Sequence, residues 1–206
     1  MPISVKCRTA INIVDVVYPD SITKAISGLK HFSADEGPGT VGKDVNFACG
    51  SFVRFYVDIE DGAVTSVTFS SNGCGYMIAA ADMLADHVAG RELTELQGLA
   101  EGRLHEYVDG RIDKAPVGRN DCIDSCINAL RGAFAHFRNS QIEEFRGEKA
   151  LVCTCFGVTE ETIDKSLQNS AVQTVEDVTS LCRAGGGCGA CTMMIQEMLD
   201  NRFDMA

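Results

Sequence analysis

The sequence predicts an α+β protein in which helices pack on a small antiparallel sheet, followed by a small all-α helix–turn–helix unit. Two observations predict this order. Between residues 51 and 70, apolar and polar side chains alternate around a turn, as the half-buried strands of a hairpin require. After residue 120, apolar residues recur at three- and four-residue steps, which is the period of an amphipathic helix.

The hairpin is the sharpest local signal in the chain. Apolar residues alternate with others in VRFYVDI, Asp61 and Gly62 follow as a turn signal, and AVTSVTFS is the returning strand. Glycines on both sides of Cys74 then end this strand. We therefore expect Cys74 to lie at the junction between the second strand and the next helix.

Helical periodicity marks three segments of the first part of the chain, at about residues 22–29, 77–87 and 122–138. Asn120 or Asp121 can cap the last of them, because a side-chain oxygen at a helix start accepts a free backbone N–H. We therefore expect Cys122 to lie at the beginning of this helix.

The polar stretch NSQIEEFRGEK, at residues 139–149, is the best candidate for a domain boundary. Thr174 and Asp177, further along, have the spacing of a capping box, which supports a helix start there. Beyond the boundary we expect short helices at about residues 159–168, 174–182 and 189–199. This segment has too little apolar surface to be stable as an independent fold, so we expect a disulfide or a bound metal to stabilise it.

These signals divide the chain into four parts. Residues 1–35 form an N-terminal extension, which we expect to pack on the first domain. That domain covers residues 36–140, a linker covers 141–150, and the second domain covers 151–206.

The composition indicates a cytoplasmic globular protein. Hydrophobic residues make up 45% of the chain and charged residues 23%. The N-terminus lacks the apolar core of a secretion signal, and no apolar run is long enough to span a membrane. A net charge of −11 argues against nucleic acid as a partner, because phosphate binding needs a basic face. Ten cysteines in such a chain favour metal or redox chemistry over a disulfide framework.

The last quarter of the chain carries two close cysteine pairs, Cys153 with Cys155 and Cys188 with Cys191. A helical hairpin between the pairs can bring their thiolates to one centre, and thiolate-only ligation suits zinc or an iron–sulfur cluster. Structural zinc sites usually present two Cys-x-x-Cys knuckles, whereas the first pair here is the tighter Cys-x-Cys. The glycines of AGGGCGAC let backbone amides approach an anion such as a cluster. These features favour a cluster, and zinc is the alternative.

The segments VCTCFGVTEETI and TVEDVTSLCRAGGGCGAC resemble the small ferredoxin domain related to bacterioferritin-associated ferredoxin, which also occurs in the middle of NifU proteins. The resemblance covers about residues 151–200 and includes both cysteine pairs, their separation and the glycine run. It implies a [2Fe–2S] cluster held by all four of these cysteines. We interpret Cys182, six residues before Cys188, as a small buried hydrophobe.

Three more cysteines, Cys49, Cys74 and Cys122, lie where a strand or helix begins or ends. The surrounding segments, PGTVGKDVNFACGSFVRFYVDIEDG and VTFSSNGCGYMIAAADMLADHVAGR, resemble the scaffold domain shared by IscU, SufU and the front of NifU, over about residues 38–139. The resemblance implies a NifU/IscU-like fold in which these cysteines hold a labile [2Fe–2S] cluster, or iron or zinc. It also implies that Cys122 accepts sulfur from a cysteine desulfurase, and a helix start would favour its thiolate.

Two residues depart from the usual pattern of that scaffold domain. Ser51 stands where an aspartate usually follows the first cysteine, and Asp121 stands where a histidine usually precedes the third. The fourth ligand is therefore open, because Asp121 can supply an oxygen ligand or only cap the helix. Cys126, one helical turn after Cys122, is either a resolving thiol or a small residue in a packed face. Cys7 receives no role.

We expect a scaffold rather than a turnover enzyme. It would build a cluster on its first domain and transfer it to apoproteins, while the second domain keeps a permanent [2Fe–2S] cluster. The expected partners are a cysteine desulfurase and apo iron–sulfur clients; an electron donor and a homodimer are left open, and nucleic acid and membrane are not expected. One alternative is a [2Fe–2S] electron carrier or redox sensor whose front domain is a docking module. The other is a zinc-dependent sulfur acceptor of the SufU type.

Overall fold

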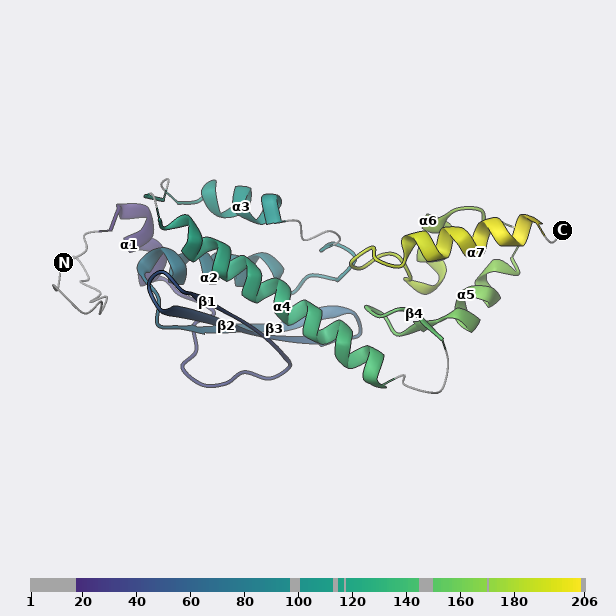
Figure 1. The fold of residues 1–206 in the computed structure, drawn as a ribbon, viewed down its shortest axis with the longest axis horizontal. Coiled ribbons are helices and arrows are strands. Elements are labelled where there is room, and N and C mark those ends of the chain that lie inside the picture. The colour runs from purple at the N-terminus through teal and green to yellow at the C-terminus, as the bar shows by residue number, and fades with distance from the viewer. Residues whose placement is uncertain are drawn as a thin grey trace. The chain divides into compact units, whose positions relative to one another are not determined.

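Figure 1 shows the computed structural model of the chain, which describes residues 18–96, 101–112, 115–116, 118–144, 150–169 and 171–204. Cys7 lies outside the described residues, as does part of the predicted linker. The elements follow along the chain in the order α1 (Asp20–Ser27), β1 (Thr40–Asn46), β2 (Ser51–Glu60), β3 (Ala63–Ser71), α2 (Gly75–Val88), α3 (Glu101–Asp109), α4 (Asn120–Glu144), β4 (Leu151–Cys153), β5 (Val158–Thr159), α5 (Glu160–Leu167), α6 (Val175–Cys182) and α7 (Thr192–Asp204).

The chain divides into two compact units. The first consists of Met1–Asp58, Thr65–Ala89 and Ala100–Ala135, and the second of Ile59–Val64, Gly90–Leu99 and His136–Ala206. We refer to these as the front and rear units. The domain limits drawn from the sequence stay a prediction.

The sheet of the front part has the antiparallel order β1-β2-β3. The predicted hairpin is confirmed, with Asp61 and Gly62 both at positive φ, as the tight turns between right-twisted strands require. Strand β1 pairs with β2 from Thr40 opposite Val57 to Asn46 opposite Ser51. This last pair lies beside the loop that carries Cys49. The α+β class is therefore confirmed.

Helices α2 and α4 run along this sheet (Figure 1) and bury most of their apolar side chains. Helix α4 lies directly on the backbone of β1, because Gly42 and Gly132 face each other without side chains: a Cβ on Gly132 would already be 3.5 Å from the Cα of Gly42. A Cβ on Gly42 would collide with the backbone of α4 at Ala129 and Ala133. The absence of side chains at these two positions therefore sets the depth of α4 on the sheet.

The described part of the N-terminal extension packs on α2. Ile22 of α1 is fully buried, and the ring of Tyr18 lies edge-on to Tyr76 at 5.9 Å between centroids. The Tyr18 hydroxyl accepts a 2.9 Å hydrogen bond from the backbone N–H of Gly75, the first residue of α2. Helix α1 therefore contacts the start of α2, next to Cys74.

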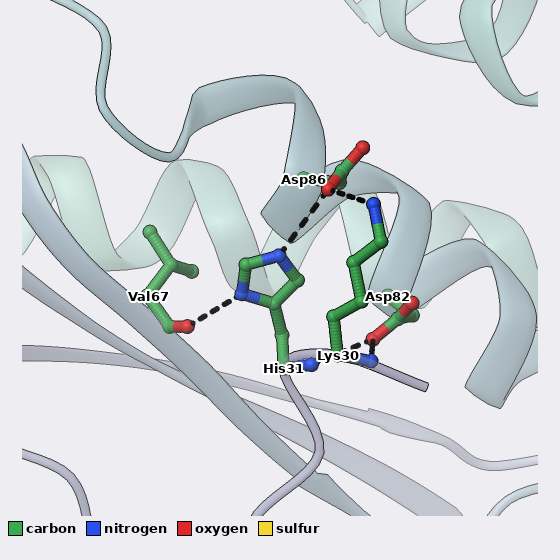
Figure 2. A network of polar contacts seen from close by, with 5 residues as sticks. All are labelled: Lys30, His31, Val67, Asp82 and Asp86. Atoms are coloured by element: carbon green, nitrogen blue, oxygen red, sulfur yellow. Dashed lines mark hydrogen bonds and ion pairs between the residues drawn. The ribbon is translucent and has the colours of Figure 1, made fainter. Parts of the chain in front are cut away.

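The segment after α1 is fastened to α2 by a polar network (Figure 2). Asp82 accepts the backbone N–H groups of Lys30 and His31, each at 2.9 Å, while Asp86 pairs with the Lys30 ammonium at 2.8 Å. The His31 ring lies between the Asp86 carboxylate, at 3.6 Å, and the Val67 carbonyl of β3, at 3.0 Å. The exposed Lys30–Asp86 pair contributes little, so the backbone bonds to Asp82 supply most of the anchoring.

The rear unit is largely helical, as predicted, but it also contains a two-stranded sheet, β4-β5, that the residue pattern did not reveal. The capping box is confirmed: Thr174 and Asp177 bond to each other's backbone N–H groups at the start of α6. Ile163, Ile195 and Leu199 are fully buried and form the centre of this small core. None of the described helices is long and apolar enough to cross a membrane.

The contact between β1 and α4 gives a first testable prediction. Gly42→Ala should destabilise the front unit by about 2 kcal/mol or more, because the added methyl group meets backbone that cannot move aside locally. Gly102→Ala is the control: nothing lies within 4 Å of a Cβ at that helical position, so it should be neutral or stabilise by up to about 1 kcal/mol. Urea denaturation followed by circular dichroism measures both. Equal midpoints for the two variants would contradict the role of this contact.

Candidate metal centres

Four of the five cysteines of the rear unit, Cys153, Cys155, Cys188 and Cys191, surround one cavity. It has a volume of about 130 Å³ and is lined by residues 152–155 and 187–191 together with Met194. The first pair comes from the end of β4 and the turn after it, and the second from the loop before α7. Cys153, Cys155 and Cys191 are buried, whereas Cys188 is exposed. The structure thus brings together all four cysteines predicted for this site.

Backbone amides point at the sulfurs of this rear site. The N–H of Cys188 donates to the Cys155 sulfur at 3.4 Å. Hydrogen bonds from the thiols of Cys155 and Cys191, and then from the backbone of Gly185, lower the pKa of Cys153. The contact with Cys153, together with burial, raises the pKa values of Cys155 and Cys191. The site therefore stabilises negative charge on sulfur even before a metal adds its own charge.

The glycine run keeps this cavity open. A Cβ on Gly187 would lie 2.7 Å from the Cβ and 2.8 Å from the sulfur of Cys155, so a side chain at this position would fill the space between the cysteine pairs. Gly185 has a φ of +89°, which other residues rarely adopt. Soft thiolates, aligned amides and a cradle without side chains fit a [2Fe–2S] cluster, which the four cysteines would hold.

Cys182 is not among the residues that line the rear cavity. It is half-buried rather than buried, which corrects the sequence interpretation, and its thiol donates to the Val178 carbonyl one turn earlier in α6 at 3.3 Å. The prediction that it is no ligand stays open to test.

Two cysteines of the front site meet at the starts of two helices. Cys74 immediately precedes α2 and Cys122 is the third residue of α4; both are buried, and their sulfurs are 3.7 Å apart. This separation is far beyond the 2.05 Å or so of a disulfide. It matches two thiolates on one tetrahedral metal ion, because metal–sulfur bonds of about 2.3 Å place the sulfurs about 3.8 Å apart.

The contact between the two sulfurs moves their pKa values in opposite directions. A hydrogen bond from Cys122, and then the backbone N–H of Met77 in the first turn of α2, lower the pKa of Cys74 to about 6. The contact with Cys74 and burial raise the pKa of Cys122. The sequence placed the favoured thiolate on Cys122, whereas these contacts favour the thiolate of Cys74. Arg119 lowers both pKa values through its positive charge.

Cys49 lies in the loop between β1 and β2 and is half-buried. Its thiol donates to the buried Ser51 hydroxyl at 3.2 Å. Negative charge at this position would raise the pKa of Cys122, which places Cys49 within electrostatic range of the pair. Among the described residues, no three His, Cys, Asp or Glu side chains are arranged to hold one metal ion. The structure therefore brings Cys74 and Cys122 together, while Cys49 lies in the adjoining loop.

The remaining candidates lie around this pair. Asp121 is exposed in the first turn of α4, which begins at Asn120, so neither residue occupies the expected position before the helix. Cys126 is fully buried, and its thiol donates to the carbonyls of Met77 and Cys122 at 3.3 and 3.2 Å. Burial raises the pKa of Cys126 well above its usual value. This environment favours the packing role over the resolving thiol.

Sequence reasoning missed one residue of the front site. The side-chain N–H of Asn46, at the end of β1, lies 3.7 Å from the Cys122 sulfur. Its place in the sequence, three residues before Cys49, was the only signal available, and that signal did not indicate a contact with Cys122.

The charge distribution predicts a pH dependence. In apo-protein, the alkylation rate of Cys74 by iodoacetamide should rise with a midpoint near pH 6, because its thiolate forms there. In Cys122→Ala the midpoint should move up towards about 8.5, since the hydrogen-bond donor is lost. Peptide mapping by mass spectrometry gives the rate at each cysteine. Cys126→Ala is the control and should leave the midpoint in place; an unchanged midpoint in Cys122→Ala would refute the assignment.

The comparisons with known proteins identify the class. The family described as "NifU-like N terminal domain" matches residues 26–144, more than half of the chain. The chain therefore belongs to the NifU-like N-terminal domain family. A second family, described as "BFD-like [2Fe-2S] binding domain", matches residues 151–201, the segment that carries all four cysteines of the rear site. The resemblances inferred from the motifs are thus confirmed.

Individual relatives agree with this class. The chain is 27% identical to the nitrogen fixation protein NifU of Trichormus azollae over 192 residues, which are 88% of this chain and 63% of that protein. It is 26% identical to NifU of Azotobacter chroococcum over 188 residues, 90% of this chain and 60% of the relative. The iron-sulfur cluster assembly scaffold protein IscU of Haemophilus influenzae is 23% identical over 117 residues, 56% and 86% of the two chains. The chain thus spans about three fifths of the length of these NifU proteins.

Two solved structures also align with it. A putative iron-sulfur cluster assembly scaffold protein for the SUF system from Fervidobacterium islandicum has a TM-score of 0.44 at 17% identity, over 56% of this chain and 95% of that chain. The N-terminal part of a NifU-like protein from Brucella abortus has a TM-score of 0.45 at 16% identity, over 59% and 94%.

Proposed function

We propose that this protein is an iron–sulfur cluster assembly scaffold that builds a cluster on Cys49, Cys74 and Cys122 and transfers it to apoproteins. The four cysteines of the rear site hold a permanent [2Fe–2S] cluster. The observation that carries the proposal is the 3.7 Å separation of the Cys74 and Cys122 sulfurs, at the metal-ligand spacing and not at the disulfide spacing. The family membership supports it.

The two sites differ in how firmly they would hold what they bind. In the rear site the cysteine pairs face each other across a cavity that glycines keep open and backbone amides surround. In the front site two buried sulfurs are fixed by helix starts, but Cys49 lies in a loop and is half-buried. The loop position of Cys49 suits release from the front site, whereas the preformed cavity and the amide hydrogen bond to the Cys155 sulfur suit retention in the rear site.

Loading of the front site begins when Cys122 passes its proton to the Cys74 thiolate. Cys122, the proposed acceptor, attacks the terminal sulfur of the persulfide on a cysteine desulfurase. A new sulfur–sulfur bond forms on Cys122, and the donor cysteine leaves as a thiolate. Arg119, whose charge favours both thiolates, and Cys74, which can take the Cys122 proton, assist this step. A rear cluster, when bound, supplies one-electron redox chemistry.

The zinc-dependent sulfur acceptor of the SufU type is the second candidate, because the 3.7 Å spacing fits zinc as well as iron. In that case Cys122 takes persulfide sulfur while zinc occupies the front site. Metal analysis of the purified protein separates the two candidates. Zinc without sulfide in the front site would favour the sulfur acceptor.

The rear assignment is tested in the full chain. Wild-type protein should hold a [2Fe–2S] cluster in this site, and changing any one of Cys153, Cys155, Cys188 or Cys191 to Ala should remove it and destabilise the rear unit, because ligation supplies folding energy. Cys182→Ala is the matched control and should keep the cluster. Iron and sulfide content, visible absorption and thermal unfolding measure this. Rear cluster loss in Cys182→Ala would contradict the assignment.

The front assignment predicts iron that a chelator removes faster than the iron of the rear site. The triple variant Cys49→Ala, Cys74→Ala, Cys122→Ala should lose this fast fraction and keep the slow one. Asp121→Ala should keep both, because Asp121 is exposed in the first turn of α4. Iron release to a coloured chelator and transfer to an apo-ferredoxin are the measurements. A triple variant with wild-type iron content would overturn the scaffold proposal, and loss of the fast fraction in Asp121→Ala would make Asp121 a ligand.

A further inference from the structure

We propose that Asn46 is a positioning residue of the front site: its side-chain amide donates a hydrogen bond to the Cys122 sulfur while its carbonyl holds the loop that carries Cys49. This inference rests on the proposed function, in which both cysteines are cluster ligands. No sequence signal pointed to Asn46, and the inference comes from its contacts.

The contacts of Asn46 fix how its amide is oriented. Asn46 is the last residue of β1 and is only 6% exposed. Its side-chain oxygen accepts the backbone N–H of Ala48 at 3.0 Å, and its backbone carbonyl accepts the N–H of Gly50 at 2.8 Å. Because the oxygen is engaged by Ala48, the amide nitrogen is the group that faces the Cys122 sulfur, 3.7 Å away. One side chain therefore contacts both parts of the site.

The residue opposite Asn46 contacts another cysteine of the site, with the hydrogen bond running in the opposite direction. Asn46 pairs with Ser51 in the last rung of the β1–β2 ladder. Ser51 is also buried, and its hydroxyl accepts the Cys49 thiol at 3.2 Å. Two uncharged side chains from one rung therefore hold two cysteines that are 73 positions apart in the sequence.

The chemistry suits a site that binds and releases. An amide N–H stabilises a thiolate or a metal-bound sulfur without offering an oxygen that competes for iron, as a carboxylate would. Hydrogen bonds to ligand sulfurs tune clusters, and loss of such outer partners typically costs about 10–100-fold in metal affinity. We therefore expect Asn46 to slow the loss of the front cluster.

The competing explanation is that Asn46 serves only the turn that contains Ala48. Asp and Ser form this kind of turn as well, but neither places an N–H on Cys122. Asn46→Asp puts a negative oxygen beside the sulfur, and Asn46→Ser leaves a shorter side chain without charge. Asn169→Asp is the matched control, because the Asn169 side chain accepts the backbone N–H of Ala171 at 3.1 Å in the same type of turn, within the rear unit.

The experiment uses the full chain reconstituted with Fe(II) and sulfide. The fast fraction of iron release to a chelator should be about 10-fold faster in Asn46→Asp and Asn46→Ser than in wild type, and unchanged in Asn169→Asp. Resonance Raman spectra should show a shifted iron–cysteine stretching band in the two Asn46 variants, a readout that a turn role alone would not move. Far-UV circular dichroism checks folding, and the Ser variant decides if the Asp variant does not fold.

The outcomes distinguish a failure of the positioning role of Asn46 from a failure of the scaffold function. Wild-type release rates and an unshifted band in the folded Asn46 variants would overturn the positioning role and leave the scaffold function intact. Wild-type protein without any fast fraction would instead overturn the scaffold function itself.

Discussion

The front site depends on two helices beginning at one place. Cys74 and Cys122 meet because α2 and α4 start side by side, which requires α4 to lie directly on the backbone of β1 at Gly42. The buried Cys126 thiol adds a second constraint, since it bonds the Met77 carbonyl in the first turn of α2. Rigid backbone, and not flexible side chains, therefore sets the distance between the two sulfurs.

This constraint explains the uneven distribution of charge over the pair. Cys74 precedes the first turn of α2, whose free N–H groups point at its sulfur, whereas Cys122 already lies within α4. One proton shared between the two sulfurs then stays on Cys122. In the proposed function a metal ion would replace that proton, so the geometry that holds the pair in the apo chain would also suit it for binding.

Much of the fold was predictable where burial follows an apolar pattern. The hairpin, α2, α4 and the capping box of α6 all appear where the sequence placed them. Strand β1 was not predicted because its buried positions are Gly42 and Asn46, which carry no apolar signal. Strand β5 was not predicted either, because a strand of two residues is too short to show a period.

The sites were predictable to a different degree. The spacing of the two rear cysteine pairs was enough to predict that they lie together, and in the structure all four line one cavity. The front cysteines come from distant segments, and only the family resemblance linked them. The proton distribution between Cys74 and Cys122, the exposure of Asp121 and the contact of Asn46 depend on tertiary packing, which no local pattern encodes.

The packed part of the front unit begins before the residues that match the family, because Tyr18 bonds to the start of α2. The family match begins at residue 26, and the sequence placed the domain start at residue 36, yet Tyr18 bonds the first residue of α2 and Ile22 is fully buried. A chain shortened to either of those starts would lose side chains that cover the start of α2, which Cys74 immediately precedes. A boundary drawn from homology alone would therefore remove part of the packing around this cysteine.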